Sequence, residues 1–354
     1  METQKRKFFK TLVTAPSPSG FEQPAQEVYR KFVTPFADEV KTDVHGNVIA
    51  YKKGTGTLRL MFSGHADEIG LMINYIDDNG FIRFQPIGGI DAGLLPGLRV
   101  NIYHNGKKVR GVLGKKPIHL LKPEDRKHAA KIKDLWIDIG AKDKKAALRR
   151  VSIGDPITFD LGMDTLKGNI VSTKATDNKV GVYVVGAILK ELADEKIETN
   201  IYSVSSVQEE IGLRGATTSA YGIDPHVGIA IDVTHATDYP GIDKNLHGDI
   251  KLNDGPVIAV GANINPKVFE LLKKAGKDVK VKYQIEAAPR GTGTDANAIQ
   301  TTRSGVAAGL VSVPNRYMHT PSEVISLKDL DETVKLLAQF ARMLKDETDF
   351  IPRV

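Results

Sequence analysis

Carboxylates and imidazoles follow several apolar, strand-like segments of this sequence. Glu209 and Glu210 follow the apolar run 200–207, and His65 follows the buried-type run 58–64. Three further candidates stand at the start of a helical segment or after another apolar run: Asp177, Asp232 and His319. Ligands of open α/β sheets bind beyond the carboxyl ends of the strands, so such a sheet would gather these distant residues in one crevice.

The residue types suit metal chemistry. Zinc, cobalt and manganese accept mixed nitrogen and oxygen ligands, and a catalytic zinc takes about three protein ligands and leaves one position open for water. With the adjacent Glu209 and Glu210 counted once, the five candidate groups exceed that number and suit two cations that share a bridging carboxylate. One carboxylate of the Glu209–Glu210 pair would then bind a cation while the other carries a proton.

Each candidate also has an ordinary structural interpretation. Adjacent glutamates are typical of a solvated strand end, His65 of a hydrogen-bonded core histidine, and Asp177 of a helix N-cap. Asp232 can cap or turn, and His319 can lie exposed in a loop. Asp67 is either a turn carboxylate or the acceptor of the second ring N–H of His65, which would fix the tautomer. The recurrence at equivalent strand ends favours a shared site.

Bulk properties indicate an ordinary globular protein of about two domains. The chain has 354 residues, of which 41% are hydrophobic and 26% charged. The absence of cysteine excludes disulfides, thiolate zinc sites and a cysteine nucleophile, and it fits a reducing compartment. We find neither a secretion signal nor an apolar run of membrane-spanning length, and we therefore expect a cytoplasmic location.

The formal net charge of +6 is unevenly distributed. Between His104 and Arg150 there are fifteen Lys and Arg residues against five Asp and Glu. Such a segment can bind nucleic acid. It contains no aromatic residue except Trp136 and no recognisable binding motif, so we favour a solvated or subunit-contacting surface.

The order of segments predicts an α/β fold with a mostly parallel sheet flanked by helices. Helical patterns cover 4–36, with a break at Pro18-Ser19-Gly20, and a strong helix with one apolar face opens at Asp177. Residues from about 70 to 160 have a different texture of short alternating strands and turns, with one expected helix at 123–132. We therefore expect residues 70–161 to form an inserted β-rich domain within a catalytic domain built from 1–69 and 162–354.

Six motifs together resemble one enzyme family. They are His65-Ala66-Asp67-Glu68-Ile69-Gly70, Thr176-Asp177-Asn178-Lys179-Val180-Gly181, Val207-Gln208-Glu209-Glu210-Ile211-Gly212-Leu213-Arg214-Gly215, Asp232-Val233-Thr234, Gly293-Thr294-Asp295-Ala296 and Arg316-Tyr317-Met318-His319-Thr320-Pro321. In this order they resemble the TET-type di-metal aminopeptidases, glutamyl and leucyl aminopeptidases that assemble into tetrahedral dodecamers. The likeness runs from Ser19-Gly20-Phe21-Glu22 to the C-terminal helix. Lys179 departs from the pattern, because the family more often has Arg there.

The resemblance implies a role for each position. His65 and Asp232 would hold one metal, Glu210 and His319 the other, and Asp177 would bridge them. Glu209 would be the general base and acid for a water activated by two divalent ions, zinc or cobalt or else manganese. The substrates would be short peptides trimmed from the N-terminus. The insert would be a barrel-like dimerisation domain, and the homo-oligomer a dodecamer built from dimers.

A flexible turn, Gly291-Thr292-Gly293-Thr294-Asp295, is expected to shape the pocket for the first side chain of the substrate. Its candidate substrate-binding residues are Gly293, Thr294 and Asp295. The neighbouring Arg290 either favours an acidic residue or is a surface arginine. The turn could also bind phosphate at a helix start, but its spacing matches neither dinucleotide-binding nor P-loop patterns.

Two rival functions remain open at this point. The first is a different amide hydrolase on the same scaffold, a deacylase or a carboxypeptidase. The second is a non-catalytic nucleic-acid-binding or assembly protein that uses the basic insert. Members of the family have also been labelled endoglucanases, but a glycosidase needs only a carboxylate pair and leaves His65 and His319 without a role.

Overall fold

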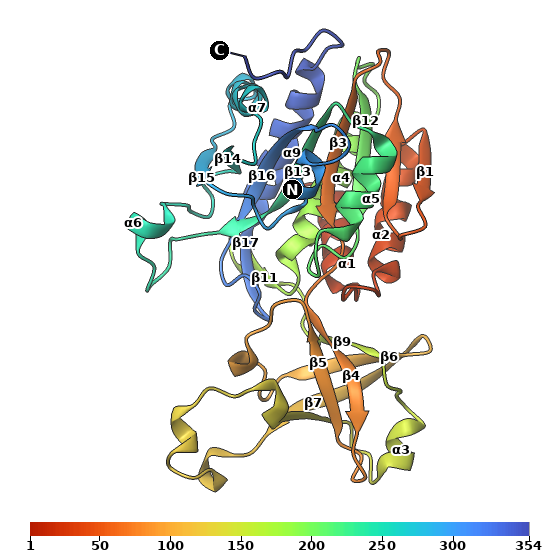
Figure 1. The fold of residues 1–354 in the computed structure, drawn as a ribbon, viewed down its shortest axis with the longest axis vertical. Coiled ribbons are helices and arrows are strands. Elements are labelled where there is room, and N and C mark those ends of the chain that lie inside the picture. Colours follow the sequence, from red (N-terminus) through yellow and green to blue (C-terminus); the bar gives the residue numbers. More distant parts are fainter. Residues whose placement is uncertain (354) are drawn as a thin grey trace.

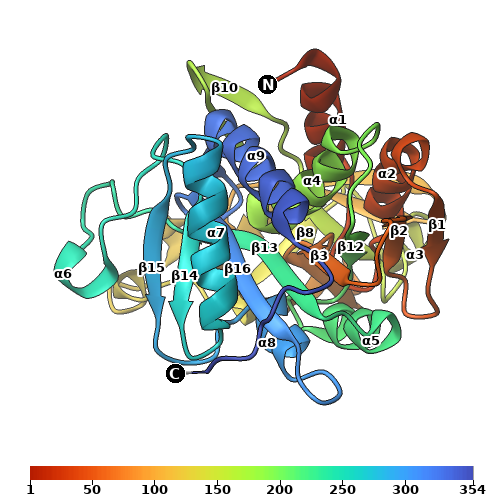
Figure 2. The same ribbon diagram turned by 90° about the horizontal axis from the view of Figure 1, so that it is seen from above.

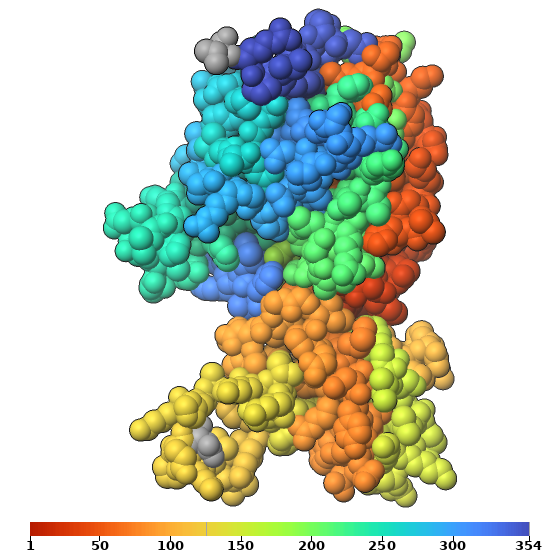
Figure 3. Space-filling model, in the orientation of Figure 1, coloured from red at the N-terminus to blue at the C-terminus, as the bar shows by residue number. Residues whose placement is uncertain are grey.

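The computed structural model describes residues 1–353 (for Asp125, the backbone only) and has two lobes (Figures 1 and 3). The larger lobe is a sheet covered by helices and contains both chain termini. The smaller lobe is a closed barrel, drawn below it in Figure 1. The α/β fold class predicted from the sequence is confirmed.

The central sheet has eight strands with four parallel strands at its middle. In spatial order the strands are β1 (Glu39–Thr42), β2 (Val48–Lys52), β12 (Asn200–Ser206), β3 (Arg59–His65), β13 (Val227–His235), β16 (Ala307–Asn315), β14 (Val257–Gly261) and β15 (Gln284–Ala288). The inner strands β12, β3, β13 and β16 run parallel, so their carboxyl ends meet at one edge of the sheet. That edge faces the barrel.

Helices cover both faces of this sheet (Figure 2). One face carries α1 (Thr3–Thr14), α2 (Gln23–Val33), α4 (Thr176–Glu191), α7 (Pro266–Asp278) and α9 (Leu327–Met343). The other face carries α5 (Arg214–Ile223) and α8 (Asp295–Gln300). The sequence predicted one apolar face for α4, but residues 176–189 are buried on all sides of the helix. The helix is enclosed between the sheet and its neighbours α1, α2 and α9.

Close contact between two glycines brings α4 onto the sheet. A Cβ atom on Gly64 of β3 would lie 2.4 Å from the carbonyl carbon of Gly181, and one on Gly181 would lie 2.6 Å from the carbonyl oxygen of Ile231. Side chains at either position would therefore push the start of α4 away from β3 and β13. The first residues of α4 lie beside the end of β3 for this reason.

A small antiparallel sheet borders the same edge. It consists of β10 (Asp164–Lys167), β11 (Ile170–Thr173) and β17 (Glu323–Ser326). Thr173 of β11 pairs with Glu323 of β17, which places Glu323 next to the chain that enters α4. A short helix, α6 (Lys244–His247), lies away from this edge, in a projecting loop (Figure 1).

The barrel contains six strands in the order β4 (Gly70–Ile76), β5 (Ile82–Ile87), β8 (Leu135–Asp138), β7 (Lys107–Lys115), β6 (Arg99–His104) and β9 (Pro156–Phe159). Its strands enclose an apolar core of their own, separate from the core of the larger lobe. Only the short helix α3 (Lys144–Leu148) accompanies them as an α-helix within the described part of this lobe.

The helix expected at 123–132 is wrong. The structure has single 3₁₀ turns instead, at Ile118–Leu120, Asp125–Lys127 and Ile132–Asp134. The segment 123–132 offers only Ala129, Ala130 and Ile132 as apolar residues after its proline, which is too few to form a buried stripe. A helix of about ten residues without tertiary packing is marginal in water.

Within residues 1–353, the helices are either too short or too polar to cross a lipid bilayer.

Candidate active site

The predicted site residues converge where the parallel strands end. His65 is the last residue of β3 and pairs with Ser206, the last residue of β12, so Glu209 and Glu210 follow at the same level. Ala230 of β13 pairs with Ser63 of β3, so Asp232 lies level with His65. The strand does not end at Asp232, because β13 continues to His235.

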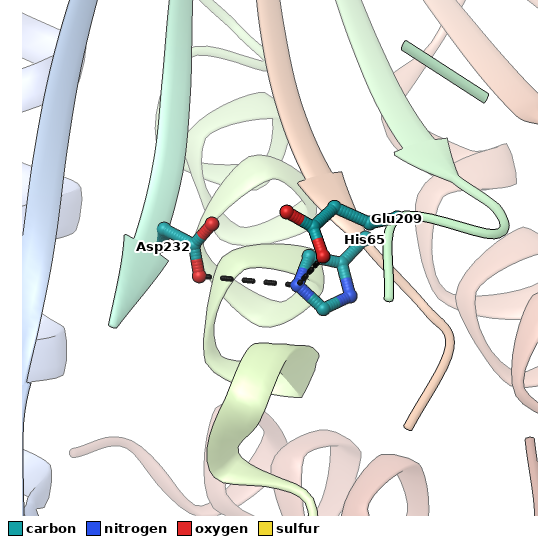
Figure 4. Close-up of side chains that lie close together, drawn as sticks. All are labelled: His65, Glu209 and Asp232. Atoms are coloured by element: carbon teal, nitrogen blue, oxygen red, sulfur yellow. Dashed lines mark ion pairs between the residues drawn. The ribbon is translucent and has the colours of Figure 1, made fainter. Parts of the chain in front are cut away.

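His65, Glu209 and Asp232 form the first group of three possible ligands (Figure 4). Their side chains point toward one another from three separate segments. The Nε2 atom of His65 lies 3.6 Å from Oε2 of Glu209 and 3.9 Å from Oδ1 of Asp232. All three side chains are buried.

Asp177, Glu210 and His319 form the second group. The Nε2 atom of His319 lies 3.2 Å from Oδ2 of Asp177 and 3.5 Å from Oε2 of Glu210. The other oxygen of Asp177, Oδ1, lies 3.2 Å from Nε2 of His65. Asp177 therefore stands between the two groups with one oxygen toward each imidazole.

Asp177 is not the cap of its helix. Asn178 performs that function, because its Oδ1 accepts from the backbone N–H of Gly181 at 2.9 Å while its amide donates to the carbonyl of Ile231. The backbone of Asp177 and Asn178 is not helical, and the carboxylate of Asp177 is directed to the site instead.

Asp67 lies beneath the two glutamates. Its carboxylate accepts the backbone N–H groups of Glu209 and Glu210, at 3.0 and 3.1 Å, and the hydroxyl of Ser19 at 2.6 Å. Nδ1 of His65 lies 3.3 Å from its Oδ1 and 3.2 Å from its backbone carbonyl. Asp67 is thus placed to orient His65 and the turn that carries both glutamates.

Burial dominates the ionisation of the glutamates. It raises the pKa of Glu209 to about 8, with His65 opposing and the neighbouring carboxylates adding to the shift. It also raises the pKa of Glu210 to about 8, with Asp177 reinforcing the shift. The pKa of the buried Asp232 is likewise raised well above its ordinary value. A proton on these oxygens is therefore held more tightly than in water.

The two histidines act against burial in setting the pKa of Asp177. Burial disfavours its carboxylate, but hydrogen bonds with His319 and His65 outweigh burial and lower the pKa of Asp177. The hydrogen bond with Asp177 in turn raises the pKa of His319 to about 9. Asp177 is accordingly the most acidic of the four carboxylates around this cavity.

The donor set fits divalent cations. A cavity of about 300 Å³ is lined by both groups, and among the described residues no Lys or Arg lines it. The buried Oε1 atom of Glu210 has no hydrogen-bond partner within residues 1–353. Four carboxylates and two imidazoles without a compensating cationic side chain are the ligands that zinc, cobalt or manganese accept.

Two of the four predicted substrate-binding residues, Gly293 and Thr294, line the cavity. The hydroxyl of Thr294 also caps α8 by accepting from the N–H of Ala296. Asp295 is buried below the cavity and accepts from the hydroxyls of Ser63 and Ser206, both at 2.7 Å. Arg290 is exposed and does not line the cavity.

Sequence reasoning missed Glu323, which is 2% exposed. Its carboxylate accepts the backbone N–H groups of both Asp177 and His319. Its position four residues after His319 was the only available signal, and exposed glutamates after a histidine are too common for that spacing to be informative.

A second buried ionic cluster was also missed. Glu68 lies 2.5 Å from Nζ of Lys174 and 3.0 Å from Nζ of Lys179, and all three side chains are buried. Lys179 also donates to the carbonyl of Ala15. The lysine that departs from the family pattern is therefore a fully buried ion-pair partner.

Known proteins match the chain along most of its length. The profile of the M42 glutamyl aminopeptidase family matches residues 46–336. The lysyl aminopeptidase of Pyrococcus furiosus is 37% identical over 352 residues, covering 97% of this chain and 98% of its own.

Solved structures are also similar to this chain along most of its length. The TET aminopeptidase of the archaeon Thaumarchaeota archaeon SCGC AB-539-E09 has a TM-score of 0.92 at 31% identity, covering 97% of each chain. The TET1 peptidase of Pyrococcus horikoshii, described as assembling into a tetrahedron or a large octahedral shell, has a TM-score of 0.86 at 33% identity, covering 96% of this chain and 100% of its own.

Fold, site and relatives define a hydrolase that acts on peptide bonds, of the aminopeptidase class. The chain belongs to the M42 glutamyl aminopeptidase family, and its structural neighbours include the TET aminopeptidases.

Proposed function

We propose that the protein releases N-terminal residues from short peptides with the help of two divalent cations. His65 and Asp232 would hold one cation, Glu210 and His319 the other, and Asp177 would contribute one oxygen to each. The position of Asp177 between the two imidazoles, at 3.2 Å from each, carries this proposal. When bound, the cations would polarise the substrate carbonyl and lower the pKa of an attacking water.

Glu209 is the residue we assign to proton transfer. The resemblance to the di-metal aminopeptidases supports this role, and with Asp177 Oδ1 at 3.2 Å from His65 Nε2 the first cation would have three ligands in His65, Asp177 and Asp232 without Glu209. In the metal-free protein burial raises the pKa of Glu209 to about 8, so its carboxylate binds a proton more readily than an ordinary glutamate does, which suits a group that takes a proton from water and returns it to the leaving amine. Asp67 holds the backbone of Glu209 and so supports its position.

The surroundings favour a substrate with a free amino terminus. The cavity is lined by Asp177, Glu209, Glu210 and Asp232, whose oxygens can accept from the N–H groups of a free amino terminus. A carboxypeptidase would instead need a cationic group to receive the substrate's carboxylate, and Lys and Arg are absent from the described lining.

The test compares free and blocked substrates on metal-depleted protein. Leucine p-nitroanilide should be cleaved after addition of zinc, cobalt or manganese and not before, while N-acetyl-leucine p-nitroanilide should remain intact. Preferential cleavage of the acetylated compound, or of a C-terminal residue, would favour a deacylase or a carboxypeptidase. Metal-independent cleavage of a β-glucan would indicate the endoglucanase activity named for some members of the family.

We further propose that the first side chain of the substrate is apolar. Apart from the ligand groups, the cavity is lined by Leu213, Val233 and Met318, with Gly293 and Thr294. A leucyl or methionyl anilide should therefore be a better substrate, by kcat/KM, than the glutamyl or lysyl compound. Faster cleavage of the glutamyl compound would contradict this preference.

The quaternary structure is proposed by analogy with the relatives. We propose that residues 70–161 form a dimerisation domain and that dimers build a dodecamer, supported by the tetrahedral and octahedral assemblies of the TET1 peptidase. Native mass spectrometry would test this state. Steeply salt-dependent binding of DNA to the basic insert would favour the nucleic-acid alternative. A cytoplasmic location remains a prediction.

A further inference from the structure

We propose that Glu323 is a positioning residue that fixes the distance between Asp177 and His319 and thereby completes the cation position formed by Glu210 and His319. This inference rests on the proposed function, because it assigns Glu323 a role in the same site. Glu323 touches no reacting atom in this account. It acts through the backbone of two ligands that are 142 residues apart in the sequence.

The carboxylate of Glu323 joins two segments with four hydrogen bonds. Its Oε2 atom accepts from the hydroxyl of Thr176 at 2.8 Å and from the N–H of Asp177 at 3.1 Å. Its Oε1 atom accepts from the N–H of His319 at 3.2 Å and from the side-chain amide of Asn315 at 3.3 Å. One oxygen thus holds the start of α4, and the other holds the segment that follows β16.

The His319 segment needs such support. His319 is in the left-handed region with a φ of 59°, and so is Tyr317 with a φ of 66°. Residues other than glycine rarely adopt this conformation, and it persists only where the surroundings hold it. The imidazole of His319 is 40% exposed, so packing fixes it less than it fixes the buried His65.

An ionised carboxylate matches all four of these groups. All four partners of Glu323 are donors, and an ionised carboxylate is acceptor-only at both oxygens. The amide of glutamine has nearly the same shape but turns an –NH₂ group toward one of the two donor pairs. Glu323→Gln therefore keeps the volume and breaks the clamp on one side.

The experiment measures cobalt binding to metal-depleted full-length protein. Cobalt chloride is titrated into wild type and Glu323→Gln, with the bound equivalents counted by elemental analysis after desalting and the site followed by visible absorption. We expect wild type to bind two equivalents. In Glu323→Gln the first equivalent should bind nearly as in wild type, because the four hydrogen bonds of Glu323 do not involve His65 or Asp232. The second should bind about 10–100-fold more weakly, the usual cost of losing the support of a ligand.

Asp329→Asn is the matched control. Asp329 is also a fully buried carboxylate, and it accepts the N–H groups of Asn253 and Gly255 at 2.8 and 3.0 Å, away from the site. It should bind both equivalents as wild type does, which separates loss of the clamp from loss of any buried carboxylate. An equal weakening in Asp329→Asn would overturn the proposal.

A second pair of variants keeps the test decisive if Glu323→Gln does not fold. Thr176→Val removes one donor to Glu323, and Thr176→Ser retains the hydroxyl. The valine variant should bind the second equivalent severalfold more weakly than wild type, and the serine variant should bind it as wild type does. Wild-type affinity for both equivalents in Glu323→Gln, or in Thr176→Val if the first is not obtained, would disprove the role of Glu323. Failure of wild type to bind two equivalents would instead overturn the proposed two-cation function.

Discussion

Two buried charged clusters lie on neighbouring stretches of the chain and are built in opposite ways. The ligand cluster comprises His65, Asp177, Glu209, Glu210, Asp232 and His319. The ion-pair cluster comprises Glu68, Lys174 and Lys179. His65 is the last residue of β3, and Glu68 follows three residues later. Asp177 lies between Lys174 and Lys179 in the sequence. Two short stretches of the chain, 65–68 and 174–179, therefore contribute residues to both clusters.

The difference lies in where the compensating charge comes from. Burial disfavours the carboxylate of Glu68, but the two lysines outweigh burial and lower its pKa. Burial raises the pKa of Glu209 and of Glu210 to about 8, because no lysine or arginine of the described residues lines their cavity. A buried carboxylate must be paired or protonated. Glu68 is paired with lysines of the protein itself, whereas the carboxylates of the ligand cluster are either protonated or paired with bound cations.

The largest effect should come from Glu209→Gln. If Glu209 carries the proton and Asp177 completes the ligand set, kcat should fall by about 10²–10⁴-fold while both cations remain bound. Steady-state kinetics and elemental analysis of the same sample check this. Loss of a cation together with activity would make Glu209 a ligand, in agreement with its proximity to His65 and Asp232.

His319→Ala should remove one of the two cations. The imidazole provides the only nitrogen of the second group, and Asp177 and Glu210 alone are a weak pair of ligands. His104→Ala is the matched control, because His104 pairs with Asp155 at 2.9 Å in the barrel, outside the cluster. Full metal content in His319→Ala, measured after desalting, would take this residue off the ligand list.

Lys179→Met tests the other side of the comparison. Lys174 still pairs with Glu68 after this change, so no buried charge is left alone, and the loss is that of the hydrogen bonds of Lys179 to Glu68 and to the carbonyl of Ala15. We expect a cost of about 1–3 kcal/mol. Denaturant unfolding of metal-depleted protein measures the change. Lys190→Met, which breaks an ion pair with the exposed Glu2, should change stability far less. Equal stability of Lys179→Met and wild type would show that the ion-pair cluster contributes nothing to the fold.

The last prediction concerns the dependence of metal affinity on pH. In the metal-free protein the pKa of Glu210 is about 8 and that of His319 about 9, so protons compete with a cation for these atoms below pH 8. Cobalt affinity should rise with pH between 6 and 8 by about tenfold per unit for each proton released. Calorimetry in buffers of different ionisation enthalpy counts those protons. An affinity that does not change over this range would mean that the ligand atoms carry no protons to displace.

The sequence was informative wherever one rule acts on local residues. Apolar strands that end on His65, Glu209 and Asp232 predict a common edge, because parallel strands place their carboxyl ends together, and the structure brings these residues to one cavity. It was less informative where tertiary contacts decide. The helix expected at 123–132 lacked an apolar face to bury, and β13 continues past Asp232 because β16 pairs with it as far as Asn315.

Glu323, Lys174 and Lys179 were out of reach for a related reason. Glu68 lies 106 and 111 residues from the two lysines, and Thr176 and Asp177 lie 147 and 146 residues from Glu323. Two of the groups that Glu323 holds are backbone N–H groups, which every residue except proline has. Side-chain types alone therefore carry no sign of these contacts. The same limit applies to Asp295, whose carboxylate proved to be directed at Ser63 and Ser206 rather than into the cavity.

The most direct test of the two-cation account is anomalous diffraction from crystals of the full chain soaked in zinc or cobalt. The account predicts two peaks in the ligand cluster, one against His65 and Asp232, the other against Glu210 and His319, with Asp177 contacting both. A single peak, or none among these six residues, would contradict it.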